Sequence, residues 1–378
     1  MKLKLHYMYH APVIFKPIHR QSFNNTQPQK WEKVLQAWEA KDYKESIYQM
    51  LDYLGIEYPT GASKLQLPHG SIQIDLHLEK DFLIIEAPFL SVEDSLKLPL
   101  YRQVLQINQD PLQLTRIQLK NNLLLFYFEC QYPLCEPQKI FDVLKEICIH
   151  ADLYDDAFIR KYRAKRISEP QIFPLETEIQ NLCVHTFKEI IAKAESTIQY
   201  LIKERQNLFL WDNFVLLFLK LDFIISPNGH LKSDIEKWIV EMHSPLELSE
   251  KINIGNKAIQ SLNRLSDEQI KEDLYQIHTF VPLKELISKK VFKNHLTQIQ
   301  SQIQREFQKG EFLAAYFTTQ YQLLMMTYQY DLDEKSMNSI LALLESSSGT
   351  VNESKIQTIL QLIQEEVDHF SNSTKDYH

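Results

Sequence analysis

The hydrophobic residues of this chain change their spacing once, and that change limits its possible folds more than any other feature. In residues 71–78 apolar and polar side chains alternate, so that the apolar ones share one face of an extended segment. Such alternation is typical of an antiparallel strand with one buried face. From Leu175 onward, almost every segment instead repeats its apolar residues at helical spacing. We therefore expect an α+β N-terminal domain followed by an all-α helical domain.

The expected α+β domain has the order helix, antiparallel hairpin, helix, hairpin, helix. The second arm of the second hairpin, residues 122–131, is apolar on both faces and should lie inside its sheet. The first helix is expected to bend between Ala40 and Tyr43, and the last one opens at Pro137. The other expected helices and strands cover residues 31–54, 71–78, 82–87, 98–107 and 112–119.

Domain boundaries are expected where prolines and polar residues interrupt these patterns. The segment 168–175 contains Pro170 and Pro174 and is the expected linker between the two domains. The ranges that follow are an N-terminal extension at 1–29, an α+β domain at 30–167, the linker at 168–175, a helical domain at 176–370 and a frayed tail at 371–378.

The distribution of charge argues against a general nucleic-acid-binding protein. The net charge is −8, and residues 1–169 carry 21 basic and 21 acidic side chains, so the excess acid lies in residues 170–378. An acidic half repels a phosphate backbone. One basic cluster runs from Arg160 to Arg166. We interpret it as the solvated end of a helix, with an anion or RNA contact as the alternative.

The N-terminal residues, the most apolar window and the cysteines indicate the compartment. The first residues carry charges and lack the apolar stretch of a signal peptide. Residues 208–225 are the most apolar window, but Asp212, Lys220 and Asp222 within it favour a buried helix over a membrane span. The cysteines show no CxxC pair and no zinc spacing, which suits a reducing compartment. They are Cys130, Cys135, Cys148 and Cys183. We expect a cytoplasmic protein without membrane insertion.

The sequence shows no motif for catalysis or for a cofactor. Its seven glycines stand alone, so they cannot form the glycine-rich loops of phosphate or dinucleotide sites. His6 and His10 lack the companion residues of a zinc motif. Glu365 and His369, four residues apart, are typical of a solvated helix face, with a metal site as the alternative. We expect no catalytic residue, no cofactor and no metal, and the alternative is an enzyme with an unrecognised site.

Four features of residues 31–165 follow one another in an order that a known family shares. The opening helix ends Met50-Leu-Asp-Tyr-Leu-Gly55 and is followed by an alternating hairpin. The central helix reads Leu98-Pro-Leu-Tyr-Arg-Gln-Val-Leu-Gln-Ile-Asn108, and a hairpin with an apolar second arm comes next. The closing helix reads Ile147-Cys-Ile-His-Ala-Asp-Leu-Tyr-Asp-Asp156. In this order the segment resembles the type III secretion chaperone fold, the Tir-chaperone and YbjN-like superfamily.

This resemblance implies a class of activity. Members of the family are mostly small, cytoplasmic, dimeric and non-enzymatic, and they bind other polypeptides. The resemblance also implies that Tyr101 and Leu105, on one side of the central helix, form a dimer contact; a position in the core is the alternative. This chain departs from the family in its length, its N-terminal extension and its acidic helical domain.

A second candidate surface for binding a partner lies in residues 316–330, which are dense in tyrosine, phenylalanine and methionine. Aromatic residues and methionine are enriched at protein interfaces. The alternative is a central helix that is buried on all sides. The candidate residues are Tyr316, Tyr321, Met325, Met326 and Tyr328.

The expected function is therefore that of a non-enzymatic protein-binding chaperone or adaptor, which holds a partner polypeptide. A homodimer is a further expectation. Apolar grooves and an exposed sheet edge of the α+β domain would hold the partner. The alternatives are a structural subunit of a multiprotein, secretion-type assembly and, third, an enzyme whose site is unrecognised.

Overall fold

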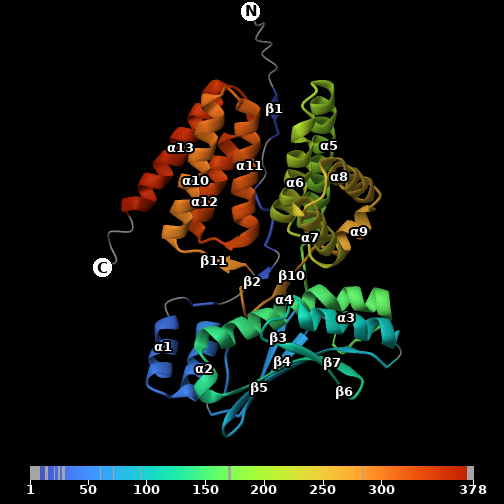
Figure 1. Cartoon of the computed structure of the whole chain (residues 1–378), viewed down its shortest axis with the longest axis vertical. Coiled ribbons are helices and arrows are strands. Elements are labelled where there is room, and N and C mark those ends of the chain that lie inside the picture. The colour runs from blue at the N-terminus through green and yellow to red at the C-terminus, as the bar shows by residue number, and fades with distance from the viewer. Residues whose placement is uncertain are drawn as a thin grey trace, which may run out of the picture. The chain divides into compact units, whose positions relative to one another are not determined.

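The N-terminal half of the chain contains an antiparallel sheet, and the C-terminal half is helical (Figure 1). This is the mixed composition that the change of periodicity predicts. The computed structural model describes residues 9–12, 16–20, 22–23, 26–27, 30–59, 61–70, 72–93, 95–168, 172–282 and 284–372. Most of the expected frayed tail, residues 373–378, lies outside the described residues.

The chain forms two compact units, and neither of them is one continuous stretch. The sheet unit consists of Gln21–Pro174 and Tyr275–Leu283, and the helical unit consists of Met1–Arg20, Leu175–Leu274 and Lys284–His378. The chain therefore enters the sheet unit twice. The sequence-based division into consecutive ranges remains a prediction.

Antiparallel strands form the main sheet of the sheet unit, in the spatial order β3-β4-β5-β7-β6, with the short strand β8 paired to β5. The side chains of Leu76, Ile85 and Phe128 stand opposite one another on neighbouring strands, and all three are buried. Three strands precede the central helix where the sequence analysis had two, because β3 was not foreseen. The bounds are β3 Lys64–His69, β4 Ile72–Leu78, β5 Phe82–Ser91, β6 Arg116–Lys120, β7 Leu123–Gln131 and β8 Lys165–Arg166.

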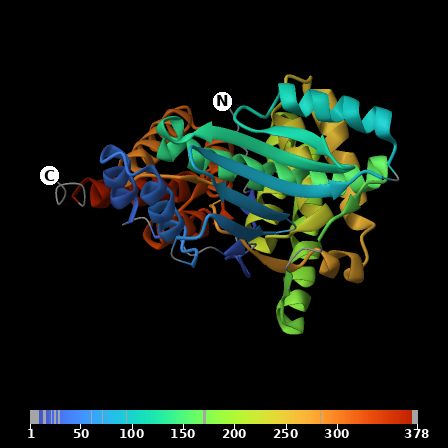
Figure 2. The same cartoon turned by 90° about the horizontal axis from the view of Figure 1, so that it is seen from below.

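One face of the main sheet is covered by helix α4 (Pro137–Tyr162), whose Ile140, Leu144 and Ile147 are buried. In Figure 2 the strands lie in front of this helix. The other face of the sheet carries both polar and apolar side chains, among them Glu86, Ile84 and the buried Leu125. There Lys120 Nζ lies 3.0 Å from Glu86 Oε1.

Helices α1 (Trp31–Glu39) and α2 (Tyr43–Tyr53) precede the main sheet. Lys41 separates them with a φ of 61°, and the side chain of Asp42 caps α2 by accepting a hydrogen bond from Glu45 N at 3.2 Å. The bend expected at residues 40–43 is therefore a break between two helices. Helix α3 (Lys97–Gln109) and the 3₁₀ turn η2 (Tyr132–Leu134) complete the helical elements of this unit's first segment.

A small three-stranded sheet joins distant parts of the chain within the sheet unit. Strand β10 (Tyr275–His278) pairs in parallel with β2 (Ser22–Phe23) and antiparallel with β9 (Ile172–Pro174). Phe280 and Val281 follow β10 and are 2% and 0% exposed in the core of the sheet unit. The second entry of the chain therefore supplies core side chains.

Helices α6 (Leu210–Lys220) and α11 (Phe312–Gln329) together contribute much of the core of the helical unit. The backbone of Gly255 on α8 lies against the ring of Phe214 on α6, where a Cβ atom would come within 2.4 Å. The elements are β1 His10–Ala11, α5 Thr177–Lys203, η3 Asn207–Phe209, α6 Leu210–Lys220, η4 Leu221–Ile225, α7 Gly229–His243, α8 Leu248–Asn263, α9 Asp267–Glu272, β11 Glu285–Leu286, α10 Lys289–Gln308, α11 Phe312–Gln329, β12 Tyr330–Asp331, α12 Glu334–Ser346, β13 Gly349–Thr350 and α13 Glu353–Asn372.

The most apolar window of the sequence forms α6 and η4, a π-helical turn, inside the helical unit. Its residues from Phe214 to Leu219 are all buried in the protein core. Within the part of the chain that the structure describes, no helix combines the length and the apolar character needed to cross a bilayer.

Candidate functional site

The outer side of helix α3 exposes large apolar side chains. Its inner side buries Leu100, Val104 and Ile107, whereas Leu98 and Leu105 are 65% and 68% exposed. Leu98, Tyr101 and Leu105 follow one another at a spacing of three and four residues and therefore share one side of the helix. Tyr101 is half-buried against the core of the unit. We call these three residues the α3 stripe.

Hydrogen bonds fix α3 to the rest of the sheet unit at both ends. Leu96 N, just before the helix, donates to Tyr162 O on α4 at 2.8 Å. At the other end, the amide of Asn108 pairs with the backbone of Ile117 on β6, which donates its N–H at 2.7 Å and accepts at 2.9 Å. The α3 stripe therefore lies on a helix that hydrogen bonds hold in place at both ends.

At the start of the edge strand β6, most backbone groups already have hydrogen-bond partners. The side chain of Asn108 bonds both the N–H and the C=O of Ile117. Glu146 of α4 accepts hydrogen bonds from the backbone N–H groups of Gln113 and Thr115, just before the strand, at 2.6 and 2.7 Å. Leu119, two residues beyond Ile117 and on the same side of the strand, is 48% exposed. An added strand would therefore find room only towards the end of β6.

The opposite edge of the main sheet, β3, contains Pro68 on its exposed side. Proline has no N–H to donate, and this property protects edge strands from pairing with other chains. Of the two edges, neither offers an uninterrupted row of donors and acceptors in the described residues.

The aromatic residues of α11 lie mostly inside the helical unit. Tyr316 and Met326 are 1% and 3% exposed, and Tyr321, Met325 and Tyr328 are half-buried against the same core. Binding through Tyr316 or Met326 would require the helical unit to open. The two predicted surfaces therefore differ in exposure: the leucines of the α3 stripe face solvent, whereas the aromatic residues of α11 are largely enclosed in the helical unit.

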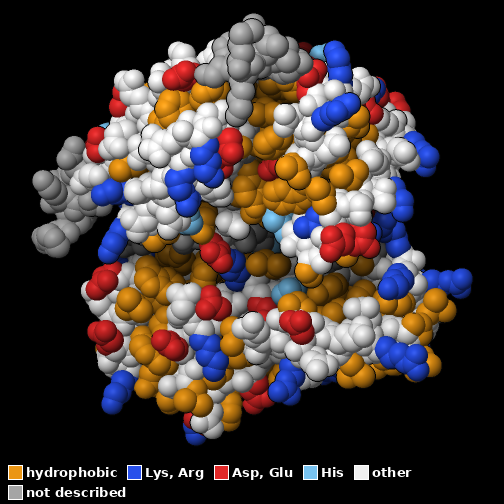
Figure 3. All heavy atoms as spheres, turned by 45° about the horizontal axis from the view of Figure 1, so that its top comes forward, with side chains coloured by type: hydrophobic (Ala, Val, Ile, Leu, Met, Phe, Trp, Pro, Cys, Tyr) orange, Lys and Arg blue, Asp and Glu red, His pale blue; other side chains and the backbone are white. Residues whose placement is uncertain are grey.

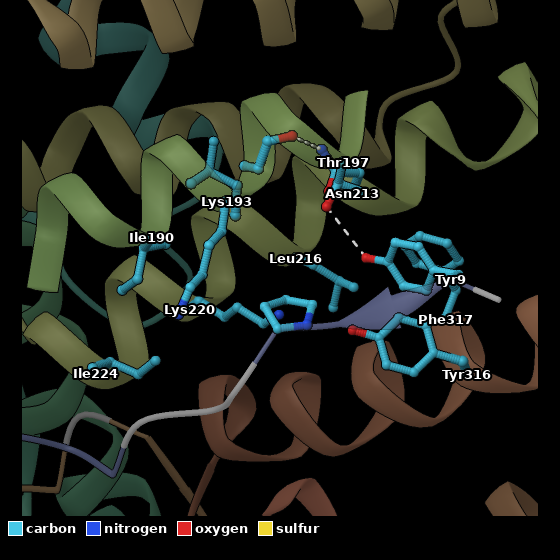
Figure 4. Close-up of a pocket in the computed structure, with 13 residues that line it drawn as sticks. Tyr9, Ile190, Lys193, Thr197, Asn213, Leu216, Lys220, Ile224, Tyr316 and Phe317 are labelled. Carbon is cyan, nitrogen blue, oxygen red and sulfur yellow. Dashed lines mark hydrogen bonds between the residues drawn. The ribbon is translucent and has the colours of Figure 1, made fainter. Parts of the chain in front are cut away.

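Tyr316 contacts a segment from the start of the chain (Figure 4). Tyr9 is 6% exposed, its ring lies 5.5 Å from that of Tyr316, and its hydroxyl is 3.2 Å from Thr197 Oγ1. Strand β1, directly after Tyr9, pairs antiparallel with β13, and Ile18 N donates to Ile224 O at 3.0 Å. The helical unit thus packs against Tyr9, strand β1 and Ile18 of its own chain.

A cavity of about 30 Å³ lies beside Tyr9 and is lined by Lys193, Asn213 and Lys220 (Figure 4). Ligand pockets usually measure about 300–1,000 Å³, so this cavity is too small for a metabolite. Burial, with a smaller contribution from Lys193, lowers the pKa of Lys220 to about 8. The cavity therefore holds an unusually acidic lysine and no room for a substrate.

Tyr321 and Tyr328 each contact a polar side chain that is distant in the sequence and was not predicted as a partner. Tyr321 Oη is 2.9 Å from His243 Nε2. The Lys232 ammonium lies 5.8 Å from the centre of the Tyr328 ring and forms an ion pair with Asp222 in the π-helical turn. Burial raises the pKa of Asp222, but the ammonium groups of Lys232 and Lys284 outweigh it, so the pKa is lowered overall.

The next features are the acidic residues and the histidine near the end of α13, considered as a metal site, and the distribution of surface charge. Glu366 and His369 line an open hollow, and Glu366 accepts a hydrogen bond from Ser339 Oγ at 2.6 Å. Among the described residues, no three histidine, cysteine or acidic side chains converge as metal ligands would. On the face of the molecule in Figure 3, acidic and basic side chains are interspersed.

Leu98 was not predicted as a site residue, although it precedes Leu105 by seven residues and so falls on the same side of a helix. That spacing was the available signal. No protein-family model and no curated protein sequence matches this chain.

Proposed function

We propose that this chain is a non-enzymatic, cytoplasmic chaperone or adaptor that binds a partner polypeptide through the α3 stripe. The resemblance of residues 31–165 to type III secretion chaperones supports this class of activity. The observation that carries the proposal is the exposure of Leu98 and Leu105, 65% and 68%, on a helix anchored at both ends.

The free energy gained by burying the two leucines can be compared with the cost of association. Burying two leucines fully contributes about 3–6 kcal/mol, whereas association costs about 4–15 kcal/mol in lost freedom. The stripe alone therefore gives weak binding. Leu96 and Leu119, 45% and 48% exposed, are further exposed apolar side chains of the same unit.

The first test is purification of the tagged full chain from its native cell, followed by mass spectrometry and sizing. We expect one dominant polypeptide at fixed stoichiometry, reduced at least tenfold with Leu98→Asp plus Leu105→Asp. Leu134→Asp is the matched control, because Leu134 is a leucine of the same unit with 61% exposure. Equal recovery of the partner with all variants would refute the proposal.

Sizing of the purified chain tests a second copy as the occupant of the stripe. A dimer that Leu98→Asp plus Leu105→Asp converts to a monomer would identify the stripe as the homodimer contact that the resemblance implies. The dissociation rate then separates the two binding functions. A chaperone releases its partner, whereas a structural subunit stays in a stable complex.

A further inference from the structure

Two of the four cysteines lie together at the end of strand β7. Cys130 is the penultimate residue of β7, and the turn η2 brings Cys135 back towards it, with Cys135 N donating to Tyr132 O at 3.0 Å. The Cys135 thiol donates to Gln131 O at 3.3 Å and lies 3.6 Å from Cys130 O. The turn therefore brings the Cys135 thiol back to the backbone of Cys130, although four residues lie between the two cysteines in the sequence.

A cation lies against this pair. Lys139 Nζ, in the first turn of α4, is 3.6 Å from Cys130 Sγ and 3.4 Å from Leu134 O. The same ammonium lies 5.5 Å from the centre of the Phe128 ring. A neighbouring ammonium stabilises a thiolate, which is the nucleophilic form of cysteine.

The two thiols differ in their surroundings. Cys130 is 7% exposed and touches Lys139, whereas Cys135 is 3% exposed. Burial raises the pKa of Cys135 to about 12, with the Cys130 thiol adding to the effect. Cys130 is therefore the one suited to react first, and Cys135 keeps its proton until a bond forms.

We propose that Cys130 and Cys135 form an oxidisable dithiol, which hydrogen peroxide converts to an intramolecular disulfide with Lys139 assisting Cys130. The site combines two neighbouring thiols with a cation, and Cys130 retains 7% of its exposure. The pair lies in the sheet unit, and the proposal is independent of the α3 stripe.

The reaction balances in two steps. Cys130, after losing its proton, attacks one oxygen of hydrogen peroxide, the O–O bond breaks, and the departing hydroxide takes up a proton as water. The Cys135 sulfur then attacks the sulfur of the Cys130 sulfenic acid, the S–O bond breaks, and the hydroxyl leaves as water with the Cys135 proton. Two thiols are oxidised and one peroxide is reduced to two waters.

The test treats the full chain with hydrogen peroxide and counts free thiols after denaturation. We expect the count to fall from four to two, with a disulfide mapped to Cys130 and Cys135 and restored to thiols by dithiothreitol. Cys148 and Cys183, both 0% exposed, are internal controls and should stay reduced. Four remaining thiols, or a disulfide that involves Cys148 or Cys183 instead, would overturn the proposal.

The role of Lys139 is tested by the rate. Lys139→Met should slow disulfide formation about tenfold, because the attacking sulfur of Cys130 loses the cation 3.6 Å away that stabilises a thiolate. Lys145→Met, on the same helix, should leave the rate unchanged. Cys135→Ser should stop the reaction at a sulfenic acid that dimedone traps. Unchanged kinetics with Lys139→Met would contradict its role, and the mapping of the disulfide does not depend on any variant folding.

Discussion

At the scale of single residues, the charges within the helical unit are its most sensitive points. Asp222 is 5% exposed and pairs with Lys232, and the half-buried Lys284 donates to Thr327 O at 2.7 Å. Asp222→Asn removes the buried carboxylate that offsets the charges of these two lysines, while Lys232 keeps Glu236 at 3.2 Å as an ion-pair partner. We expect a loss of about 3–5 kcal/mol in the free energy of unfolding, measured by urea denaturation.

Asp267→Asn is the control for this experiment, because Asp267 pairs with Lys188 and both side chains are about half exposed. Exposed pairs contribute about 0–1 kcal/mol, so this variant should remain close to the parent. Equal losses in the two variants would contradict a stabilising role of the buried carboxylate.

Lys220 gives a prediction about pH. Its pKa in the folded chain, about 8, lies below the ordinary value of 10.5, so the unfolded chain binds the proton more tightly. Between pH 8 and 10.5 this group therefore makes the folded state more stable as the pH rises. Lys220→Met removes the cost of the buried charge and should raise stability by about 1–3 kcal/mol at pH 7.

The same variant should differ less and less from the parent as the pH approaches 10.5, because the parent lysine is then neutral in the folded state. Urea denaturation of both proteins at several pH values measures this. A stability difference that is constant over the whole range would show that Lys220 titrates normally.

Residue roles were predictable where local spacing decides them. The seven-residue interval between Leu98 and Leu105 marks one side of a helix, but the sequence does not tell which side faces solvent. Asp222 and Lys232 are ten residues apart, and their ion pair across the end of α6 depends on tertiary packing. The charged residues of the apolar window therefore indicated a buried helix, but the sequence did not show which residues pair with them.

At the scale of the elements, the contact between α3 and β6 positions the α3 stripe. Asn108→Ala removes both hydrogen bonds to Ile117, and a buried backbone group left without a partner costs about 1–3 kcal/mol. We expect faster amide hydrogen exchange at Ile117 and a loss of stability of this size. Gln109→Ala changes the next, exposed side chain and should have neither effect. Unchanged exchange at Ile117 in Asn108→Ala would contradict the anchoring of α3.

The longer helices and most strands of the main sheet followed from local patterns, whereas strand β3 and the short strands β2 and β8 to β13 were not predicted. A bend was expected at residues 40–43, where the structure has a break between two helices, and Lys41 with a φ of 61° accounts for it. Strand β3 was missed although Leu65 and Leu67 alternate with polar residues, since it is short and contains Pro68. Its register comes from pairing with β4 through the turn at Gly70, which has a φ of 52°.

At the scale of the whole molecule, each unit is assembled from segments that lie far apart in the sequence. The sheet unit needs Tyr275–Leu283, and Phe280 and Val281 lie in its core. A fragment of residues 21–174 lacks both side chains, so it should unfold at lower urea concentration than the sheet unit of the full chain. Adding the peptide 275–283 should restore part of the difference. A fragment as stable as the intact unit would show that this second entry contributes nothing to stability.

The division into units was the least predictable property, since strand pairing between β10, β2 and β9 joins residues more than 100 positions apart. No composition shift or proline cluster reports such pairing. The placement of Tyr9 against Thr197 and Tyr316 in the helical unit is another long-range contact of this kind.

The central claim is that the α3 stripe contacts a partner polypeptide, and a photo-crosslinking amino acid at position 105 tests it most directly. Position 134 is the control, since Leu134 has a similar exposure of 61%. After irradiation of native cells, we predict one crosslinked polypeptide at position 105 and none at position 134. No crosslink at position 105, or the same products at both positions, would contradict the claim.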